Sequence, residues 1–163
     1  MEIKPTILVV DDEPGARQSL EVILEDNYQV MSVGSGQEAL EVLQKEPISL
    51  VLLDVNMPEM DGLAVLRRIK EQDEETDVIM VSALNMARKA VDAIKLGAYD
   101  YITKPYEPDD ILSTVNRVIS KQKLYKELDY LRREVEESRG FDQIVSQDKT
   151  MQEIFSLIKK VAF

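Results

Sequence analysis

The chain has 163 residues, of which 44% are hydrophobic and 31% charged, and its 31 acidic and 20 basic side chains give a formal net charge of -11. This length suits one domain with an appendage, and the hydrophobic content is too high for a disordered chain. Because the sequence contains no cysteine and no histidine, it excludes disulfide frameworks, thiol nucleophiles, structural zinc sites and any mechanism with a histidine base. The acidic balance disfavours non-specific binding to nucleic acid and indicates that cations matter.

Five short strand-like runs alternate with amphipathic stretches over the first part of the chain. The predicted strands are Thr6–Val10, Gln29–Val33, Leu50–Leu53, Asp77–Val81 and Tyr99–Thr103. The first, third and fourth are nearly continuous apolar runs, which is typical of strands buried on both faces of a parallel sheet. The sequence therefore predicts an α/β fold, a flavodoxin-like doubly wound five-stranded parallel sheet with strand order 2-1-3-4-5 and an extended C-terminal helix. No apolar run approaches the ~20 residues that span a membrane, so we expect no membrane partner and a cytoplasmic protein.

The last predicted helix begins near Pro108 and meets no stop signal until Gly140. Its second half carries an apolar seam with 4-3-4 spacing, formed by Leu124, Leu128, Leu131 and Val135. That spacing is typical of a coiled coil, and pairs such as Lys123/Glu127 and Asp129/Arg133 support the helix on its other faces. We therefore expect a homodimer through this helix, with a solvated single helix as the alternative.

Polar residues come directly after four of the predicted strands. Asp11 and Asp12 follow the first strand, Asp54 the third, Ser82 the fourth and Lys104 the fifth. Because the carboxyl ends of parallel strands meet at one edge of the sheet, we expect these side chains at the edge where such folds bind ligands. Each residue alone is an ordinary turn or cap residue, so the prediction depends on their convergence.

The chemistry of these five side chains favours a magnesium and phosphoryl site. Carboxylate oxygens are ligands that Mg²⁺ prefers, and a carboxylate beside a divalent cation can attack a phosphoryl group to form an aspartyl-phosphate. Asp54 is the best-placed nucleophile because it projects from the central strand. The Lys104 ammonium and the Ser82 hydroxyl can then neutralise or bind two of the three phosphoryl oxygens.

Four motifs carry a resemblance to a known family. They are Val10–Pro14 (VDDEP), Leu53–Gly62 (LDVNMPEMDG), Val81–Ala83 (VSA) and Gly97–Pro105 (GAYDYITKP). Together they resemble the receiver domain of two-component response regulators over about residues 4–121, and we expect the receiver domain to span 1–121. The resemblance implies a domain that takes a phosphoryl group from a sensor histidine kinase in a Mg²⁺-dependent reaction.

The same resemblance implies individual roles. Asp54 is the phosphoacceptor, and Asp11 and Asp12 hold Mg²⁺ together with Asp54 and the backbone carbonyl of Asn56. Lys104 contacts the phosphoryl group.

The resemblance also implies roles for three further residues. Pro105 follows a cis peptide bond, which is accessible before proline. Ser82 is the hydroxyl switch, and Tyr101 is the aromatic residue that turns inward when Ser82 moves. Because Tyr99 and Tyr101 are two residues apart on a predicted strand, we expect both to project from the same side of the sheet.

The tail resembles a second family more weakly. Residues 144–162 are similar to the entry into the AAA+ ATPase domain of sigma-54-dependent transcriptional activators of the NtrC type. The resemblance implies that residues 141–163 are the truncated start of an AAA+ domain, and the apolar seam predicts a coiled-coil linker over 122–140. Within 141–163, the spacing of Met151, Ile154, Phe155 and Ile158 predicts one apolar stripe on a helix. In the longer protein, sigma-54 RNA polymerase and DNA would be partners, but not through this chain.

The sequence has no G-x-x-x-x-G-K-[ST] loop, so no ATPase activity through such a loop is expected of it. The only chemistry predicted for the chain is its own phosphorylation from a phosphodonor. One alternative is a haloacid-dehalogenase-like phosphatase, which needs an acid/base aspartate two positions after the nucleophile, where this chain has Asn56. A second alternative is a stand-alone receiver that acts as a protein-binding adaptor.

Overall fold

The computed structural model describes residues 3–83, 87–147, 153, 154, 156 and 157. The chain divides into two compact units, Met1–Ser120 and Lys121–Phe163. The strands and helices, in chain order, are β1 (Thr6–Val10), α1 (Pro14–Leu24), β2 (Gln29–Val33), α2 (Gly36–Lys45), β3 (Leu50–Asp54), α3 (Gly62–Gln72), β4 (Asp77–Ala83), α4 (Ala87–Lys95), β5 (Asp100–Lys104) and α5 (Pro108–Gln147).

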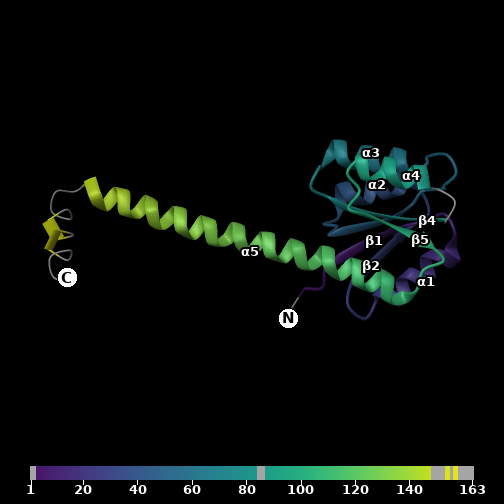
Figure 1. Cartoon of the computed structure of the whole chain (residues 1–163), viewed down its shortest axis with the longest axis horizontal. Helices are drawn as coiled ribbons and strands as arrows, with labels where there is room; N and C mark the ends of the chain where they lie inside the picture. Colours follow the sequence, from purple (N-terminus) through teal and green to yellow (C-terminus); the bar gives the residue numbers. More distant parts are fainter. Residues whose placement is uncertain (1–2, 84–86, 148–152, 155, 158–163) are drawn as a thin grey trace. The chain divides into compact units, whose positions relative to one another are not determined.

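The five strands form one parallel sheet with the order β2-β1-β3-β4-β5, which confirms the predicted topology. Helices α2, α3 and α4 cover one face of this sheet, and α1 and the part of α5 within the first unit cover the other (Figure 1). The crossover helices that parallel strands require thus bury both faces of the sheet. The strand bounds differ from the prediction by only one or two residues at the ends of β3, β4 and β5.

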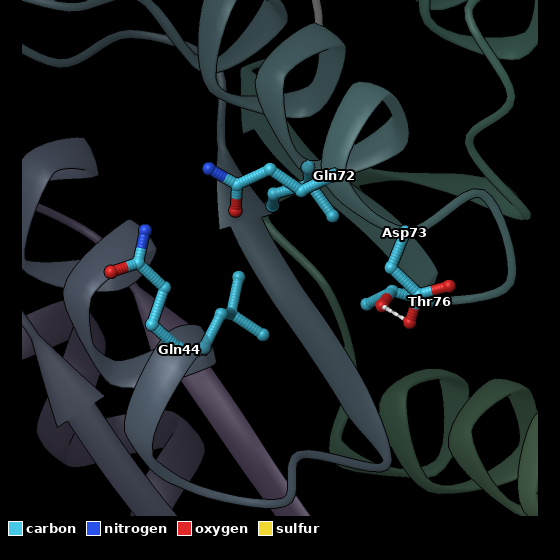
Figure 2. Close-up of a pocket in the computed structure, with 6 residues that line it drawn as sticks. Gln44, Gln72, Asp73 and Thr76 are labelled. Atoms are coloured by element: carbon cyan, nitrogen blue, oxygen red, sulfur yellow. Dashed lines mark hydrogen bonds between the residues drawn. The ribbon is translucent and has the colours of Figure 1, made fainter.

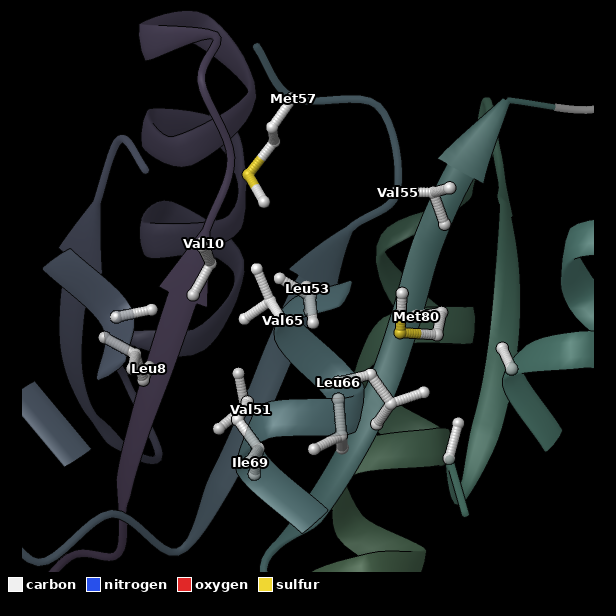
Figure 3. Packing of buried hydrophobic residues seen from close by; sticks show 14 of the residues in the cluster. Leu8, Val10, Val51, Leu53, Val55, Met57, Val65, Leu66, Ile69 and Met80 are labelled. Atoms are coloured by element: carbon white, nitrogen blue, oxygen red, sulfur yellow. The ribbon is translucent and has the colours of Figure 1, made fainter. Parts of the chain in front are cut away.

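Alternating residues of each central strand enter two separate hydrophobic clusters. On β1, Leu8 and Val10 pack toward α2 and α3, whereas Ile7 and Val9 pack toward α1 and α5. Figure 3 shows the first cluster, in which side chains from β1, β3 and β4 meet those of α3. Because each strand buries both of its faces, its sequence is a continuous apolar run that ends where the polar residues of the sheet edge begin.

Two helix starts have side-chain caps. The Ser35 hydroxyl accepts a hydrogen bond from the backbone N–H of Glu38 at 3.2 Å and donates to the Glu38 carboxylate at 3.1 Å. The Asp61 carboxylate accepts from the backbone N–H groups of Leu63 at 2.7 Å and Ala64 at 3.2 Å, which fixes the start of α3. Such caps satisfy donors that the first turn of a helix leaves unpaired.

Helix α5 continues to Gln147, so the predicted stop at Gly140 is wrong. A glycine ends a helix when it takes a left-handed conformation, but Gly140 lacks a positive φ. Inside a helix, glycine costs only about 1 kcal/mol relative to alanine, which its helix-forming neighbours offset.

Of the predicted apolar stripe, Ile154 is 47% exposed, and Met151, Phe155 and Ile158 lie outside the described residues. No helix in the described part of the chain combines the length and apolar composition needed to cross a bilayer.

Candidate functional site at the carboxyl edge of the sheet

Three carboxylates converge at the carboxyl ends of β1 and β3. These strands are neighbours, and Val10 pairs with Leu53 in their register, so the residues that follow emerge at the same level. One carboxylate oxygen from each of Asp11, Asp12 and Asp54 lies within 4.8 Å of the other two. Asp11 and Asp54 are buried, and Asp12 is the most exposed of the three. The structure therefore brings together all three aspartates that the sequence places at this edge.

Lys104, at the end of β5, reaches two of these carboxylates. Its Nζ atom lies 2.7 Å from Oδ2 of Asp11 and 3.4 Å from Oδ1 of Asp54. The side chains of the two aspartates are only 3% and 7% exposed. Charge-assisted hydrogen bonds of this kind are stronger in a partly buried site than in water. The peptide bond between Lys104 and Pro105 is cis, as predicted.

The electrostatics of the cluster show a surplus of negative charge. Burial raises the pKa of the Asp54 carboxyl from its usual 3.8 to about 6; the neighbouring charges of Asp11 and Asp12 add to this rise, and Lys104 opposes it. Burial alone would lower the pKa of Lys104, but its hydrogen bond to Asp11 and the charges of Asp54 and Asp11 raise it on balance. The Lys104 ammonium contacts two of the three clustered carboxylates, so the cluster keeps surplus negative charge and favours an additional cation.

The backbone around Asp11 is held by the start of α1. The backbone N–H of Glu13 donates to Oδ1 of Asp11 at 2.9 Å, and the Arg17 guanidinium donates to the Asp11 carbonyl at 2.7 Å. Asp11 thus has both carboxylate oxygens engaged, one by Glu13 and one by Lys104. Sequence reasoning missed the roles of Arg17 and Glu13, because only the folded turn brings them to this carboxylate.

The loop between β3 and α3 lies directly after Asp54. The N–H of Gly62 donates to the Val55 carbonyl at 2.8 Å, and a Cβ atom at position 62 would lie 2.1 Å from the backbone oxygen of Asp54. Only glycine permits α3 to begin this close to the end of β3. The MPEMDG part of the motif therefore ends in glycine because any side chain at position 62 would collide with the backbone of Asp54.

Lys89 on α4 contacts the same loop. Its Nζ atom lies 3.5 Å from Oδ1 of Asn56 and 3.7 Å from Oδ2 of Asp61. Asn56, proposed from sequence as a carbonyl ligand, thus has its side chain turned to α4. The sequence offered no signal for Lys89, because the contact depends on how α4 packs beside the loop.

The two predicted switch residues lie on β4 and β5. Ser82 is fully buried and directly follows Val81, the residue that pairs with Asp54. Tyr101 packs against the cluster beneath α2, α3 and α4, and its buried hydroxyl has no hydrogen-bond partner among the described residues. Tyr99 packs against the opposite cluster, so the expectation that both tyrosines share one side is wrong. Strand β5 begins at Asp100, and the strand alternation does not extend back to Tyr99.

A separate pocket lies between the C-terminal ends of α2 and α3 (Figure 2). Its polar lining includes Gln44, Gln72, Asp73 and Thr76, and the Thr76 hydroxyl donates to Asp73 at 2.9 Å. Because the helices run antiparallel to the strands, this pocket lies at the amino edge of the sheet. It is therefore distinct from the carboxylate cluster.

The fold and this cluster define a class of protein: an α/β domain with an acidic cluster and a lysine at the carboxyl edge of a parallel sheet. Residues 7–116 match the family of response regulator receiver domains, and the chain belongs to that family. Receivers are signalling domains, and the match gives no support to the phosphatase or the adaptor alternative.

Individual relatives agree with this assignment. The chain is 32% identical over 163 residues to the C4-dicarboxylate transport transcriptional regulatory protein DctD of Rhizobium meliloti, covering 99% of this chain and 35% of DctD. It is 34% identical over 116 residues to the chemotaxis protein CheY of Bacillus subtilis, covering 70% of this chain and 97% of CheY.

A solved structure of NtrX from Brucella abortus superposes with a TM-score of 0.72 at 36% identity, over 78% of this chain and 30% of NtrX. The chain thus spans about a third of the length of DctD and of the regulatory protein AtoC of Escherichia coli.

Proposed function

We propose that this chain accepts a phosphoryl group on Asp54 from a sensor histidine kinase and thereby switches the dimer or output state of a sigma-54-dependent transcription activator. The observation that carries the proposal is the convergence of Asp11, Asp12 and Asp54 with Lys104 at one edge of the sheet. Such a site offers a nucleophile, ligands for a cation and a fixed positive charge for a transferred phosphoryl group.

Asp54 is a better acceptor than Asp11 because its carboxylate is less engaged, and it is more deeply buried in the site than Asp12, the most exposed of the three aspartates. Both oxygens of Asp11 accept short hydrogen bonds, at 2.7 and 2.9 Å. Asp54 makes one longer contact among the described residues, 3.4 Å from Oδ1 to Lys104. Its second oxygen remains available to attack a phosphorus atom from the open side of the sheet edge.

In the proposed reaction, an oxygen of Asp54 forms a bond to phosphorus while the P–N bond to the phosphohistidine of the kinase breaks. The leaving imidazole takes a proton from water, and the product is an acyl phosphate. Lys104 would hold one phosphoryl oxygen by charge, and the Ser82 hydroxyl would donate to another. Asp11, Asp12, Asp54 and the carbonyl of Asn56 fit an all-oxygen site for Mg²⁺, which when bound neutralises charge on the phosphoryl oxygens.

The output would begin at Ser82 and Tyr101. A phosphoryl oxygen on Asp54 would attract the Ser82 hydroxyl, and Tyr101 would move into the space this opens. The unpartnered Tyr101 hydroxyl supports this view, since a buried hydroxyl without a partner is unfavourable and gains from a second position. The face formed by α4, β5 and α5 would then differ between the two states.

For the longer protein we propose the organisation that the sequence predicts. Residues 122–140 serve as a dimeric coiled-coil linker, and residues 141–163 are the start of an AAA+ domain. The alignments with AtoC and DctD support this, since they continue beyond the receiver and cover 96% and 99% of the chain. DctD is a transcriptional regulatory protein, and this supports transcription regulation as the output of the longer protein.

The test is incubation with acetyl phosphate and Mg²⁺, followed by intact-protein mass spectrometry. We expect one added phosphoryl group that is lost on treatment with hydroxylamine, as an acyl phosphate requires. The Asp54→Asn variant should remain unmodified, and the matched variant Asp73→Asn, at the opposite edge of the sheet, should be modified like the wild type. Modification that persists in Asp54→Asn would overturn the assignment, and steady turnover of p-nitrophenyl phosphate would favour a phosphatase instead.

A further inference from the structure

Arg17, in the first half of α1, reaches back to the turn that carries Asp11 and Asp12. Its Nη1 atom donates to the backbone carbonyl oxygen of Asp11 at 2.7 Å, a short distance for a bond of this kind. That carbonyl belongs to the peptide group between the two aspartates. Because a peptide group is planar, the guanidinium also fixes the N–H and the Cα atom from which the Asp12 side chain leaves the backbone.

The other hydrogen-bonding groups of Asp11 have partners as well. Its N–H donates to the Val33 carbonyl at 3.3 Å, its Oδ1 accepts from Glu13 at 2.9 Å, and its Oδ2 accepts from Lys104 at 2.7 Å. The Asp12 carboxylate, in contrast, has no hydrogen-bond partner among the described residues. The position of Asp12 is therefore set through its backbone.

The Arg17 guanidinium also lies over Gly34, in the turn between β2 and α2. A Cβ atom at position 34 would lie 3.3 Å from Nη1 and 3.8 Å from Cζ of Arg17. Gly34 has no positive φ, so this close approach, rather than the backbone conformation, disfavours a side chain there. Arg17 is thus held between the turn after β1 and the turn after β2.

The charge of Arg17 gives no reason for its place beside a cation site. The charges that shift the pKa of Asp54 are those of Lys104, Asp11 and Asp12. A positive side chain repels a nearby Mg²⁺ ion, so the charge of Arg17 by itself weakens binding. Any gain in Mg²⁺ affinity from Arg17 must therefore come from the geometry of the turn that it holds.

We infer that Arg17 is a positioning residue of the Mg²⁺ site, and that its hydrogen bond to the Asp11 carbonyl keeps the Asp12 carboxylate in place for the ion. The inference rests on Mg²⁺ binding in the proposed function and adds a residue that acts through the backbone. Like charges repel, so an Asp12 side chain that is not held would turn away from the other carboxylates, and binding would include the cost of turning it back. Replacing a residue that orients metal ligands typically lowers metal affinity by about 10–100-fold.

Titration of the full chain with MgCl2 at constant ionic strength, followed by backbone amide chemical shifts, tests the inference. Arg17→Met keeps an unbranched side chain but removes the donors and the charge. We expect its dissociation constant for Mg²⁺ to rise by about tenfold or more. Arg17→Lys keeps a donor and should recover part of this loss. The matched control Arg68→Met, at an exposed position of α3, should bind Mg²⁺ like the wild type.

Positioning and charge predict opposite signs for this variant. If only the charge of Arg17 acted on the ion, Arg17→Met would bind Mg²⁺ more tightly than the wild type. An equal or lower dissociation constant in Arg17→Met would therefore overturn the inference, while labelling of Asp54 by acetyl phosphate would remain a separate result. A wild type without saturable Mg²⁺ binding would overturn both the inference and the Mg²⁺ site of the proposed function.

Gly34→Ala tests the same contact from the other side. The new Cβ atom should displace the guanidinium slightly and raise the dissociation constant for Mg²⁺ by about two- to threefold. In a chain that already carries Arg17→Met, Gly34→Ala should have no further effect, because the guanidinium is gone. The same loss of affinity in both backgrounds would overturn the role of the guanidinium.

The rate of phosphorylation and urea denaturation separate a purely structural role. In Arg17→Met, the Mg²⁺ concentration that gives half the maximal rate with acetyl phosphate should rise by the same factor as the dissociation constant, with a smaller fall in the rate at saturating Mg²⁺. If Arg17→Met lowers the stability without Mg²⁺ but leaves that concentration unchanged, Arg17 only stabilises the fold and the inference is wrong.

Discussion

The two units of the chain differ in whether their apolar side chains are buried or exposed. Within residues 3–120, the β-strands bury alternate side chains on both faces of the sheet, and buried polar groups are few, with Asp11, Asp54 and Ser82 all near the carboxyl edge. Within residues 121–140, the described large apolar side chains are all about half exposed or more. The first unit buries its apolar side chains within itself, whereas the second exposes them on a surface of the kind that binding partners cover.

The charges follow the same division. Residues 1–120 carry 23 of the 31 acidic and 11 of the 20 basic side chains, whereas residues 121–163 carry 8 acidic and 9 basic side chains. The surplus of negative charge thus belongs to the α/β unit, where three carboxylates converge. The nearly neutral remainder can approach a copy of itself without strong repulsion.

The largest expected effect compares a buried and an exposed leucine. Leu66 is fully buried in the cluster beneath α3, so Leu66→Ala should lower the free energy of unfolding by about 2–5 kcal/mol. Leu131 is 49% exposed, and Leu131→Ala should change it by less than about 0.5 kcal/mol at concentrations where the chain is monomeric. Urea denaturation of both variants measures this difference. Equal losses would mean that Leu131 packs within its own chain and would contradict the division.

The next effect compares two glycines. In Gly62→Ala, the new Cβ atom would lie 2.1 Å from the Asp54 carbonyl oxygen, so α3 must shift and we expect a loss of about 1–3 kcal/mol. Gly140 lies inside α5 with no neighbour within 4 Å of a new Cβ. Gly140→Ala should therefore stabilise this part of α5 by about 0.5–1 kcal/mol and raise its helix content. Thermal unfolding and far-ultraviolet circular dichroism distinguish the two, and a neutral Gly62→Ala would contradict the close approach of α3 to Asp54.

A smaller effect concerns the pH dependence of stability without Mg²⁺. Because burial raises the pKa of Asp54 from 3.8 to about 6 in the fold, the folded state binds more protons than the unfolded state between these values. The contribution of Asp54 to the free energy of unfolding therefore falls as the pH rises through this window, and it is lost above about pH 6. Asp54→Asn should stabilise the protein by about 1–2 kcal/mol at pH 8, less than the full pKa difference because Lys104 loses a partner.

Two comparisons sharpen this prediction. At pH 3.5 the wild type and Asp54→Asn should unfold at similar denaturant concentrations, because both side chains are then neutral. At pH 8, Mg²⁺ should stabilise the wild type more than the variant, since a bound cation relieves the repulsion among the carboxylates. A wild type that is more stable than Asp54→Asn at pH 8 without Mg²⁺ would show that Lys104 outweighs burial.

The strand order and the carboxylate cluster could be predicted from the sequence because both depend on short-range patterns. Continuous apolar runs identify the buried strands, and the residue after each run must lie at the carboxyl edge. Asp11, Asp12 and Asp54 therefore follow from the pattern alone. The predicted helix end at Gly140 is wrong because Gly140 does not take the left-handed conformation with which glycine commonly ends a helix, and α5 continues to Gln147.

The contacts of Lys104 and Lys89 required the structure. Both lysines reach residues far away in the sequence, and the angle at which each side chain leaves its element decides its partner. The placement of Tyr99 also failed, because β5 begins one residue later than predicted and Tyr99 therefore lies outside its regular alternation of side chains. Site composition was thus predictable, whereas pairing within the site was not.

The smallest effect concerns a surface ion pair of the first unit. The Nη2 atom of Arg117 on α5 lies 2.6 Å from Oδ2 of Asp100 at the start of β5, but the two side chains are 59% and 37% exposed. Water screens such a pair, and the ordering of two long side chains offsets much of the attraction, so Arg117→Gln should lower stability by no more than about 0.5 kcal/mol. Urea denaturation at low and high salt, with Asp100→Asn and the double variant completing a cycle, isolates the pair. A coupling above about 1 kcal/mol would mean that surface charge, and not burial alone, holds α5 to the sheet.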